Sequence, residues 1–155
     1  MKNLGIKDSN GGAGHVPGVH VWLVLAKAAH ALAARAGDSI AGLGMCASDF
    51  GALETLLHKG PLPVNALGRK LLLTSGSITT AVDRLERRGL VARRNDPHDR
   101  RARVVHLTPA GRKLIEKAFA AHAVDMEEAV SALSAGERAA LVESLKKLGK
   151  EEGES

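Results

Sequence analysis

The spacing of apolar residues predicts a mainly helical chain. From Pro17 to about Ala36 the sequence is strongly apolar and rich in alanine, and Gly37 is expected to end this first helix. Because the helix is apolar on several faces, it needs burial on more than one side, and in a chain this short a partner subunit is a natural source of that burial. The glycine-containing segment 38–47 is predicted to be a loop.

Three shorter helices are predicted in the middle of the chain. The first begins after Ser48, a good N-cap, and ends before a Gly-Pro pair; the second covers 63–70. The third covers 74–88 and is closed by Gly89. A short turn joins 63–70 to 74–88, as in a helix-turn-helix. One face of the 74–88 helix carries apolar residues at positions i, i+4 and i+7, namely Ile78, Val82 and Leu85.

After residue 89 the pattern changes to two short strands and then returns to helix. Residues 90–94 and 103–107 are predicted to form a β-hairpin with a long, charged connection. A long helix is expected from residue 108 to about residue 131. Ser134 and Glu137 form a capping box at the start of the last helix. The apolar stripe of that helix consists of Leu141, Leu145 and Leu148.

Composition places the chain among soluble globular proteins of one ordinary domain. It has 155 residues, of which 45% are hydrophobic and 25% charged, and its formal net charge of +5 makes a polyanion a candidate partner. The only cysteine is Cys46, which excludes a disulfide within the chain and favours a reducing compartment. No apolar stretch approaches the roughly 20 residues that cross a bilayer, and no signal-peptide core is recognisable. A cytoplasmic protein without membrane contact is therefore expected.

Positive charge gathers in the predicted hairpin, where residues 93–103 hold five arginines and two aspartates. Beside it, the polar face of the 74–88 helix begins with small or hydroxylated residues, which let a helix lie deep in a major groove. Arginines at a hairpin tip suit the negative potential of a narrow minor groove, and Asp99 can hold the tip in shape. The predicted contacts to double-stranded DNA are Ser75, Gly76, Ser77, Thr79, Thr80, Arg84, Arg93, Arg94, Arg100, Arg101 and Arg103.

Residues 77–114 resemble the core of the MarR family of regulators, and the resemblance extends more loosely over about 17–149. The matching features are the run Val-Asp-Arg-Leu-Glu before Gly-Leu-Val, the run Asp-Pro-x-Asp-Arg-Arg at 96–101, and Leu-Thr-Pro-x-Gly after it. The resemblance implies a homodimer with intertwined terminal helices, whose two winged domains contact successive half-sites of a palindrome. It also implies that Arg101 contacts the minor groove with Asp99 as its structural partner, and that Ser75, Thr79 and Thr80 lie in the recognition helix.

The fold class expected on this basis is mainly α with a small β-hairpin wing. Residues 48–108 would form a winged helix-turn-helix, and 17–47 and 109–149 would supply dimerisation helices and a loop within a single domain over 17–149. Residues 1–16 are predicted to be a flexible arm and residues 150–155 a frayed tail.

Five residues are candidates for sensing an effector. Cys46 precedes a predicted helix, whose N-terminus favours a thiolate, and some members of the resembled family sense oxidants or quinones through one cysteine. Family members also bind small aromatic acids in the cleft between the dimer helices and the winged domain. Four further residues are candidates to line that cleft, with plain packing as the alternative: His20, Trp22, His30 and Phe50.

Other function classes find little support in the sequence. No histidine or cysteine spacing matches a metal site, and there is no nucleophile elbow, phosphate loop or paired-carboxylate pocket. Neither a metal, a cofactor nor an enzyme is expected. The expected function is a sequence-specific transcriptional regulator, a repressor released by a small phenolic ligand or by oxidation or quinone modification. The alternative is a winged-helix protein-interaction module that does not bind DNA, and the arginines of the hairpin argue against it.

Overall fold

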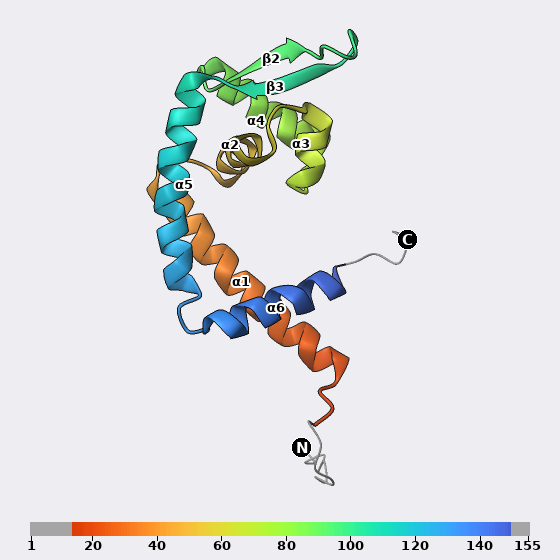
Figure 1. The fold of residues 1–155 in the computed structure, drawn as a ribbon, viewed down its shortest axis with the longest axis vertical. Coiled ribbons are helices and arrows are strands. Elements are labelled where there is room, and N and C mark those ends of the chain that lie inside the picture. The colour runs from red at the N-terminus through yellow and green to blue at the C-terminus, as the bar shows by residue number, and fades with distance from the viewer. Residues whose placement is uncertain (1–13, 150–155) are drawn as a thin grey trace. The chain divides into compact units, whose positions relative to one another are not determined.

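The structure is a computed structural model that describes residues 14–149. This part of the chain is mainly helical with a small antiparallel sheet, as predicted (Figure 1). In chain order the elements are α1 (Gly18–Gly42), α2 (Ala47–Lys59), β1 (Leu62–Pro63), α3 (Val64–Lys70), α4 (Ser75–Arg87), β2 (Val91–Asn95), β3 (Arg103–Leu107), α5 (Pro109–Ala129) and α6 (Ala135–Leu148).

The described chain divides within α1 into two units, residues 14–33 and residues 34–149. The helix-turn-helix and the hairpin belong to the second unit. Most of the predicted arm, residues 1–16, lies outside the described residues, and so does the predicted tail, residues 150–155.

The first helix is longer than predicted. It continues past Gly37 to Gly42, so the predicted loop over 38–47 shrinks to residues 43–46. A glycine inside a helix costs only about 1 kcal/mol. Packing outweighs that cost here, because Ile40 in the last turns is 8% exposed and belongs to the hydrophobic core.

Two further details differ from the sequence prediction. The N-cap of α2 is Cys46 rather than Ser48, and it makes no side-chain capping bond. The short strand β1 was not predicted; its Leu62 pairs with Val105 of β3 and its Pro63 with Val104. Because β1 lies at the edge of the sheet, whose order is β1-β3-β2, a proline without an N–H is tolerated there.

Local signals fix both ends of α4. The Thr74 hydroxyl accepts a hydrogen bond from the Ser77 N–H at 3.2 Å, as an N-cap should. Beyond the C-terminus Gly89 has φ of +71°, the left-handed conformation that glycine adopts without strain. The predicted stripe of Ile78, Val82 and Leu85 is buried. One face of α4 is therefore committed to the core and the other is left to solvent.

The core of the second unit joins α2, α3, α4, the sheet and α5 around aliphatic side chains. Its largest fully buried members are Leu53, Leu56, Leu67, Ile78, Leu85, Ile115, Val82, Val91 and Val105. The start of α5 approaches the chain before β2 so closely that a Cβ on Gly111 would lie 1.9 Å from the Leu90 carbonyl oxygen. Glycine at this position therefore lets α5 pack against the base of the hairpin.

The last helix begins at the predicted capping box. The Ser134 hydroxyl accepts from the Glu137 N–H, and the Glu137 carboxylate accepts from the Ser134 N–H at 2.8 Å, which lowers the pKa of Glu137. None of the residues of α6 is buried. No single helix within residues 14–149 is long and apolar enough to span a membrane.

Candidate nucleic-acid interface

The first two turns of α4 present a bare polar surface. All five of the residues predicted there are exposed, and a Cβ added to Gly76 would meet nothing within 4 Å. The first N–H groups of a helix lack partners within the helix, and together they favour an anion. The exposed residues are Ser75, Gly76, Ser77, Thr79 and Thr80.

A hollow of about 390 Å³ connects this surface to the hairpin. Asn65 at the start of α3, Ser75 and Thr79 of α4, and Arg103 of β3 are among the residues that line it. Asn65 was not among the predicted contact residues, although its position in the first turn of the first helix of a helix-turn-helix could have indicated it. The hollow joins the start of α4 to the hairpin in one continuous face, and its apolar lining residues are Pro63, Val64, Ile78 and Ala102.

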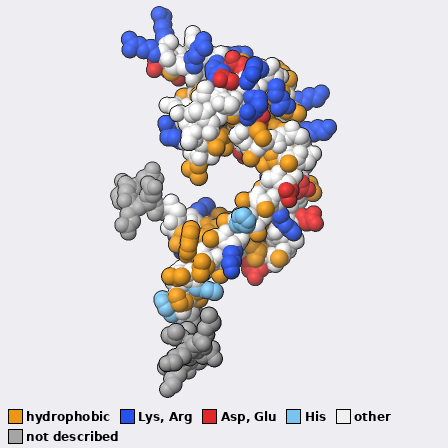
Figure 2. Space-filling view, turned by 180° about the vertical axis from the view of Figure 1, so that it is seen from behind, with side chains coloured by type: hydrophobic (Ala, Val, Ile, Leu, Met, Phe, Trp, Pro, Cys, Tyr) orange, Lys and Arg blue, Asp and Glu red, His pale blue; other side chains and the backbone are white. Residues whose placement is uncertain are grey.

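The hairpin tip carries exposed arginines on a turn that is held by hydrogen bonds. Arg100 and Arg101 are exposed, and Figure 2 shows lysine and arginine side chains gathered at the tip, at the upper left of that view. The Asp99 carboxylate accepts from the Arg101 N–H at 2.9 Å, and the Asp99 carbonyl accepts from the Ala102 N–H at 3.0 Å. The Asp96 carboxylate accepts from the His98 N–H at 2.8 Å. These bonds fix the backbone that projects the two arginines.

Arg93 has partners inside the protein. Its guanidinium contacts the Asp83 carboxylate at 2.6 Å and the Glu86 carboxylate at 3.2 Å, and its side chain is 17% exposed. Burial lowers its pKa, but hydrogen bonds and the charges of Asp83 and Glu86 outweigh that effect and raise it. Arg93 therefore ties β2 to α4, whereas Arg94 and Arg103 on the two strands remain exposed.

Arg84 also has a partner that the sequence did not indicate. Its Nε donates to both oxygens of Asp49 at 3.1 and 3.0 Å, and a terminal nitrogen lies 2.5 Å from one of them. Hydrogen bonding and the charge of Asp49 raise the pKa of Arg84. Asp49 is 3% exposed and lies on α2, so this ion pair fastens α4 to α2. The predicted reach of Arg84 toward DNA conflicts with this use of its guanidinium.

The candidate effector residues are divided between the two units. His20, Trp22 and His30 are exposed on α1 in the first unit. In the second unit, Phe50 is 5% exposed in the core, where it packs edge-on against His122. Cys46 is exposed, and its Sγ lies 3.4 Å from the Ser48 hydroxyl and 3.5 Å from a terminal nitrogen of Arg84.

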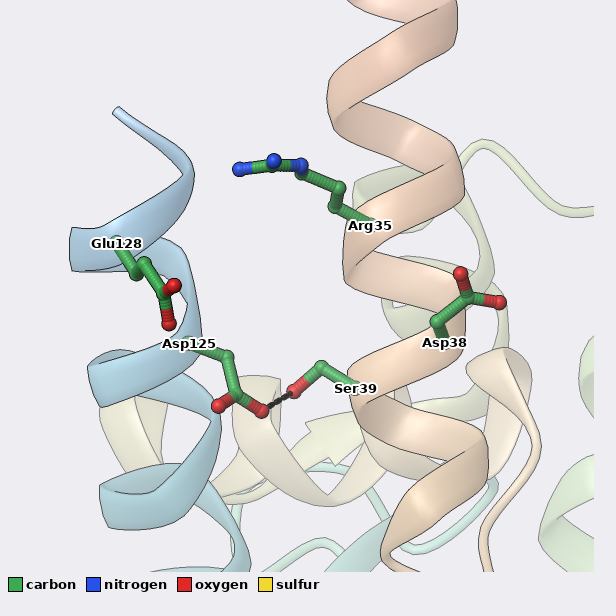
Figure 3. A pocket seen from close by; sticks show the side chains of 5 residues that line it. All are labelled: Arg35, Asp38, Ser39, Asp125 and Glu128. Atoms are coloured by element: carbon green, nitrogen blue, oxygen red, sulfur yellow. Dashed lines mark hydrogen bonds between the residues drawn. The ribbon is translucent and has the colours of Figure 1, made fainter. Parts of the chain in front are cut away.

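A pocket of about 220 Å³ lies between the end of α1 and α5 (Figure 3). It is lined by Arg35, Asp38, Ser39, Asp125 and Glu128, and the Ser39 hydroxyl donates to Asp125 at 2.5 Å. Three carboxylates against one guanidinium disfavour an aromatic acid as its occupant. Within residues 14–149 no group of three or more metal-ligating side chains is suitably placed to hold a metal ion.

Comparison with known proteins identifies the class of protein to which this chain belongs. The model of the MarR family matches residues 47–102. The HTH-type transcriptional regulator MhqR of Bacillus subtilis (strain 168) is 36% identical over 83% of this chain and 89% of its own length. A probable transcriptional regulator from Pseudomonas aeruginosa has 35% identity and a TM-score of 0.71, over 83% of this chain and 96% of that chain.

A further solved structure is BpsR of Bordetella bronchiseptica, whose DNA binding is described as regulated by 6-hydroxynicotinic acid. It is similar with 27% identity and a TM-score of 0.73, over 84% of this chain and 98% of that chain. These relatives are transcriptional regulators rather than enzymes. They support a DNA-binding regulator and not the alternative, a winged-helix module without DNA binding.

Replacing Arg84 by alanine should destabilise the fold by about 2 kcal/mol or more, because the Asp49 carboxylate would stay buried with only Arg88 near it. The free energy of unfolding in urea measures the loss. Arg87→Ala is the matched control, since the exposed Arg87 bonds only to a carbonyl of its own helix; its effect should stay within about 0.5 kcal/mol. Equal stabilities for the two variants would refute the anchoring role of Arg84.

Replacing Arg101 by alanine should weaken DNA binding at least about tenfold and make the salt dependence shallower, because a cation leaves the wing. The dissociation constant on one duplex, measured at several salt concentrations, tests this. Lys117→Ala, an equal loss of charge at an exposed position on α5, is the control. If both variants bind alike, the tip is not a DNA contact.

Proposed function

The chain belongs to the MarR family of DNA-binding transcriptional regulators, and on this premise we propose that it is a homodimeric repressor of a palindromic operator. The observation that carries the proposal is the continuous face formed by the bare start of α4 and the arginine-bearing hairpin. In a helix-turn-helix the start of the second helix contacts base edges, and a cationic hairpin suits the neighbouring minor groove. A regulator that acts on chromosomal DNA is expected in the cytoplasm.

Exposed apolar surface on both units supports the homodimer. In the first unit, Val19 is 70% and Trp22 65% exposed, and in the second Leu145 of α6 is 37% and Leu148 65% exposed. In each unit these side chains lie close together along one helix, and an exposed apolar patch of this kind marks an interaction site. A second copy of the same chain would cover it, and residues 17–47 and 109–149 would then serve as dimerisation segments around the winged domain, 48–108.

Two-fold symmetry of the dimer leads to the palindrome. Two copies of one domain related by a two-fold axis read the same sequence on opposite strands, and two recognition helices fit a duplex when they lie about 34 Å, one helical turn, apart. Each α4 would then lie in a major groove. Each wing would place Arg100 and Arg101 in the flanking minor groove. Repression follows where the operator overlaps a promoter.

We propose two routes of release, a small phenolic or other aromatic ligand and modification of Cys46. The first is supported by the similarity to BpsR, which responds to an aromatic acid. The second is supported by the contact of the Cys46 sulfur with Arg84, which fastens α4. Conjugate addition of the thiolate to a quinone forms an S–C bond while a ring C=C π bond breaks. One carbonyl oxygen takes a proton from solvent and the other takes the proton lost from the attacked ring carbon, which leaves a hydroquinone adduct whose bulk would disturb that anchor. The geometry of α4 would change and DNA affinity would fall.

Charges on the apolar stripe of α6 should dissociate the dimer. The double variant Leu141→Glu and Leu145→Glu would bury two carboxylates against the partner, which is strongly unfavourable. Sedimentation velocity should show monomers, and binding to a duplex should fall sharply because only one domain can engage. The control is Lys146→Glu on the same helix, which leaves the stripe intact. A double variant that sediments like the wild type would contradict the proposed interface.

A serine in place of Cys46 distinguishes release by thiol modification from release by a bound ligand. Cys46→Ser should bind DNA like the wild type but keep that affinity after treatment with a quinone, because serine does not add to the ring under the same conditions. A gel-shift titration with intact-mass measurement checks both points. Loss of binding by treated Cys46→Ser would exclude Cys46 as the sensor. The same titration with phenolic acids tests the ligand route.

A further inference from the structure

Leu72, in the turn between α3 and α4, is unusual in two independent ways. Its φ is +54°, and it is the only non-glycine residue with a positive φ in the described chain. Its side chain is 93% exposed. A bulky residue in the left-handed region is strained, and an exposed leucine gains nothing from burial, so neither property stabilises the isolated fold.

The backbone here forms a helix C-terminus that normally takes glycine. The Leu73 N–H donates to the Gly68 carbonyl at 2.9 Å and the Leu72 N–H to the Arg69 carbonyl at 3.2 Å. This pair of bonds is the Schellman motif, with Leu72 at the left-handed position. Leu71 and Leu73 on either side pack against the core, and Leu72 alone projects outward.

The surroundings of Leu72 favour DNA as its partner. The side chain is two residues before the N-cap of α4, at the end of the recognition helix that a helix-turn-helix directs into the major groove. Exposed Arg69 and Lys70 precede it, and exposed Ser75 and Gly76 follow it. Within residues 25–123, all of which the structure describes, no other large hydrophobic side chain is exposed. A protein interface would need a patch of such side chains.

We propose that Leu72 makes an apolar contact with the operator at the edge of the major groove, against a thymine C5-methyl group or a deoxyribose. The proposal rests on the DNA-binding surface described for α4 and the hairpin, and it adds a specificity residue to that surface. The methyl group is the one apolar feature on the base edges of the major groove, and aliphatic side chains recognise it. A strained, exposed leucine is then explained by what it binds.

The test is Leu72→Gly, which relieves the strain and removes the side chain. Its melting temperature should equal or exceed that of the wild type, while its dissociation constant should rise about tenfold on the duplex that the wild type selects from a random-sequence library. Leu72→Asn, which tolerates the same backbone, should lose affinity likewise, and Leu72→Met should keep most of it. Unchanged affinity of Leu72→Gly would overturn the proposal.

Substituting uracil for each thymine of the half-site in turn distinguishes the two sources of apolar surface. If a methyl group is the partner, one uracil weakens the wild type and leaves Leu72→Gly unaffected. If no uracil matters and Leu72→Gly still binds weakly, the deoxyribose is the partner. Sedimentation of Leu72→Gly as a monomer would overturn the proposal in favour of a contact with the second copy. Failure of the wild type to select any duplex would instead defeat the proposed function itself.

Discussion

The recognition surface depends on how firmly one face of α4 is held. Ile78, Val82 and Leu85 bury that face, but aliphatic packing alone tolerates small rotations of a helix. The ion pair between Asp49 and Arg84 restrains the orientation of α4. Its bidentate contact, to a carboxylate that is 3% exposed, fixes the guanidinium in one plane. A helix that must present small polar side chains to base edges needs this kind of restraint, since a shift of about 1 Å disturbs hydrogen bonds to bases.

A second set of charges connects the same helix to the hairpin. Asp83 and Glu86 of α4 hold Arg93 of β2, so the base of the wing moves with the recognition helix. Of the arginines predicted to contact DNA, Arg84 and Arg93 pair with carboxylates inside the protein, and the other four remain exposed: Arg94, Arg100, Arg101 and Arg103. The exposed Cys46 sulfur lies beside the Asp49–Arg84 pair, 3.5 Å from a terminal nitrogen of Arg84.

Local signals in the sequence predicted much of this arrangement. The cap at Thr74, the stripe of α4, the glycine at 89 and the capping box of α6 each depend on residues close together in the chain, and each is present in the structure. The end of α1 and the strand β1 were missed because tertiary packing decides them. The partner of Arg84 lies 35 residues away, and no local pattern identifies it. For the same reason the sequence leaves Phe50 open between lining a cleft and plain packing, since its burial, at 5% exposed, depends on the fold.

In the proposed complex, two copies of one rigid surface, α4 with its wing, bind one duplex. Hydroxyl-radical footprinting of the bound duplex tests this most directly, because it maps the sugar positions that the protein covers on each strand. The proposed dimer should give two equivalent patches of protection related by two-fold symmetry. Their major-groove contacts should lie about one helical turn apart, with an outer minor-groove contact beside each. A single patch without a symmetric counterpart, or protection without the outer contacts, would contradict it.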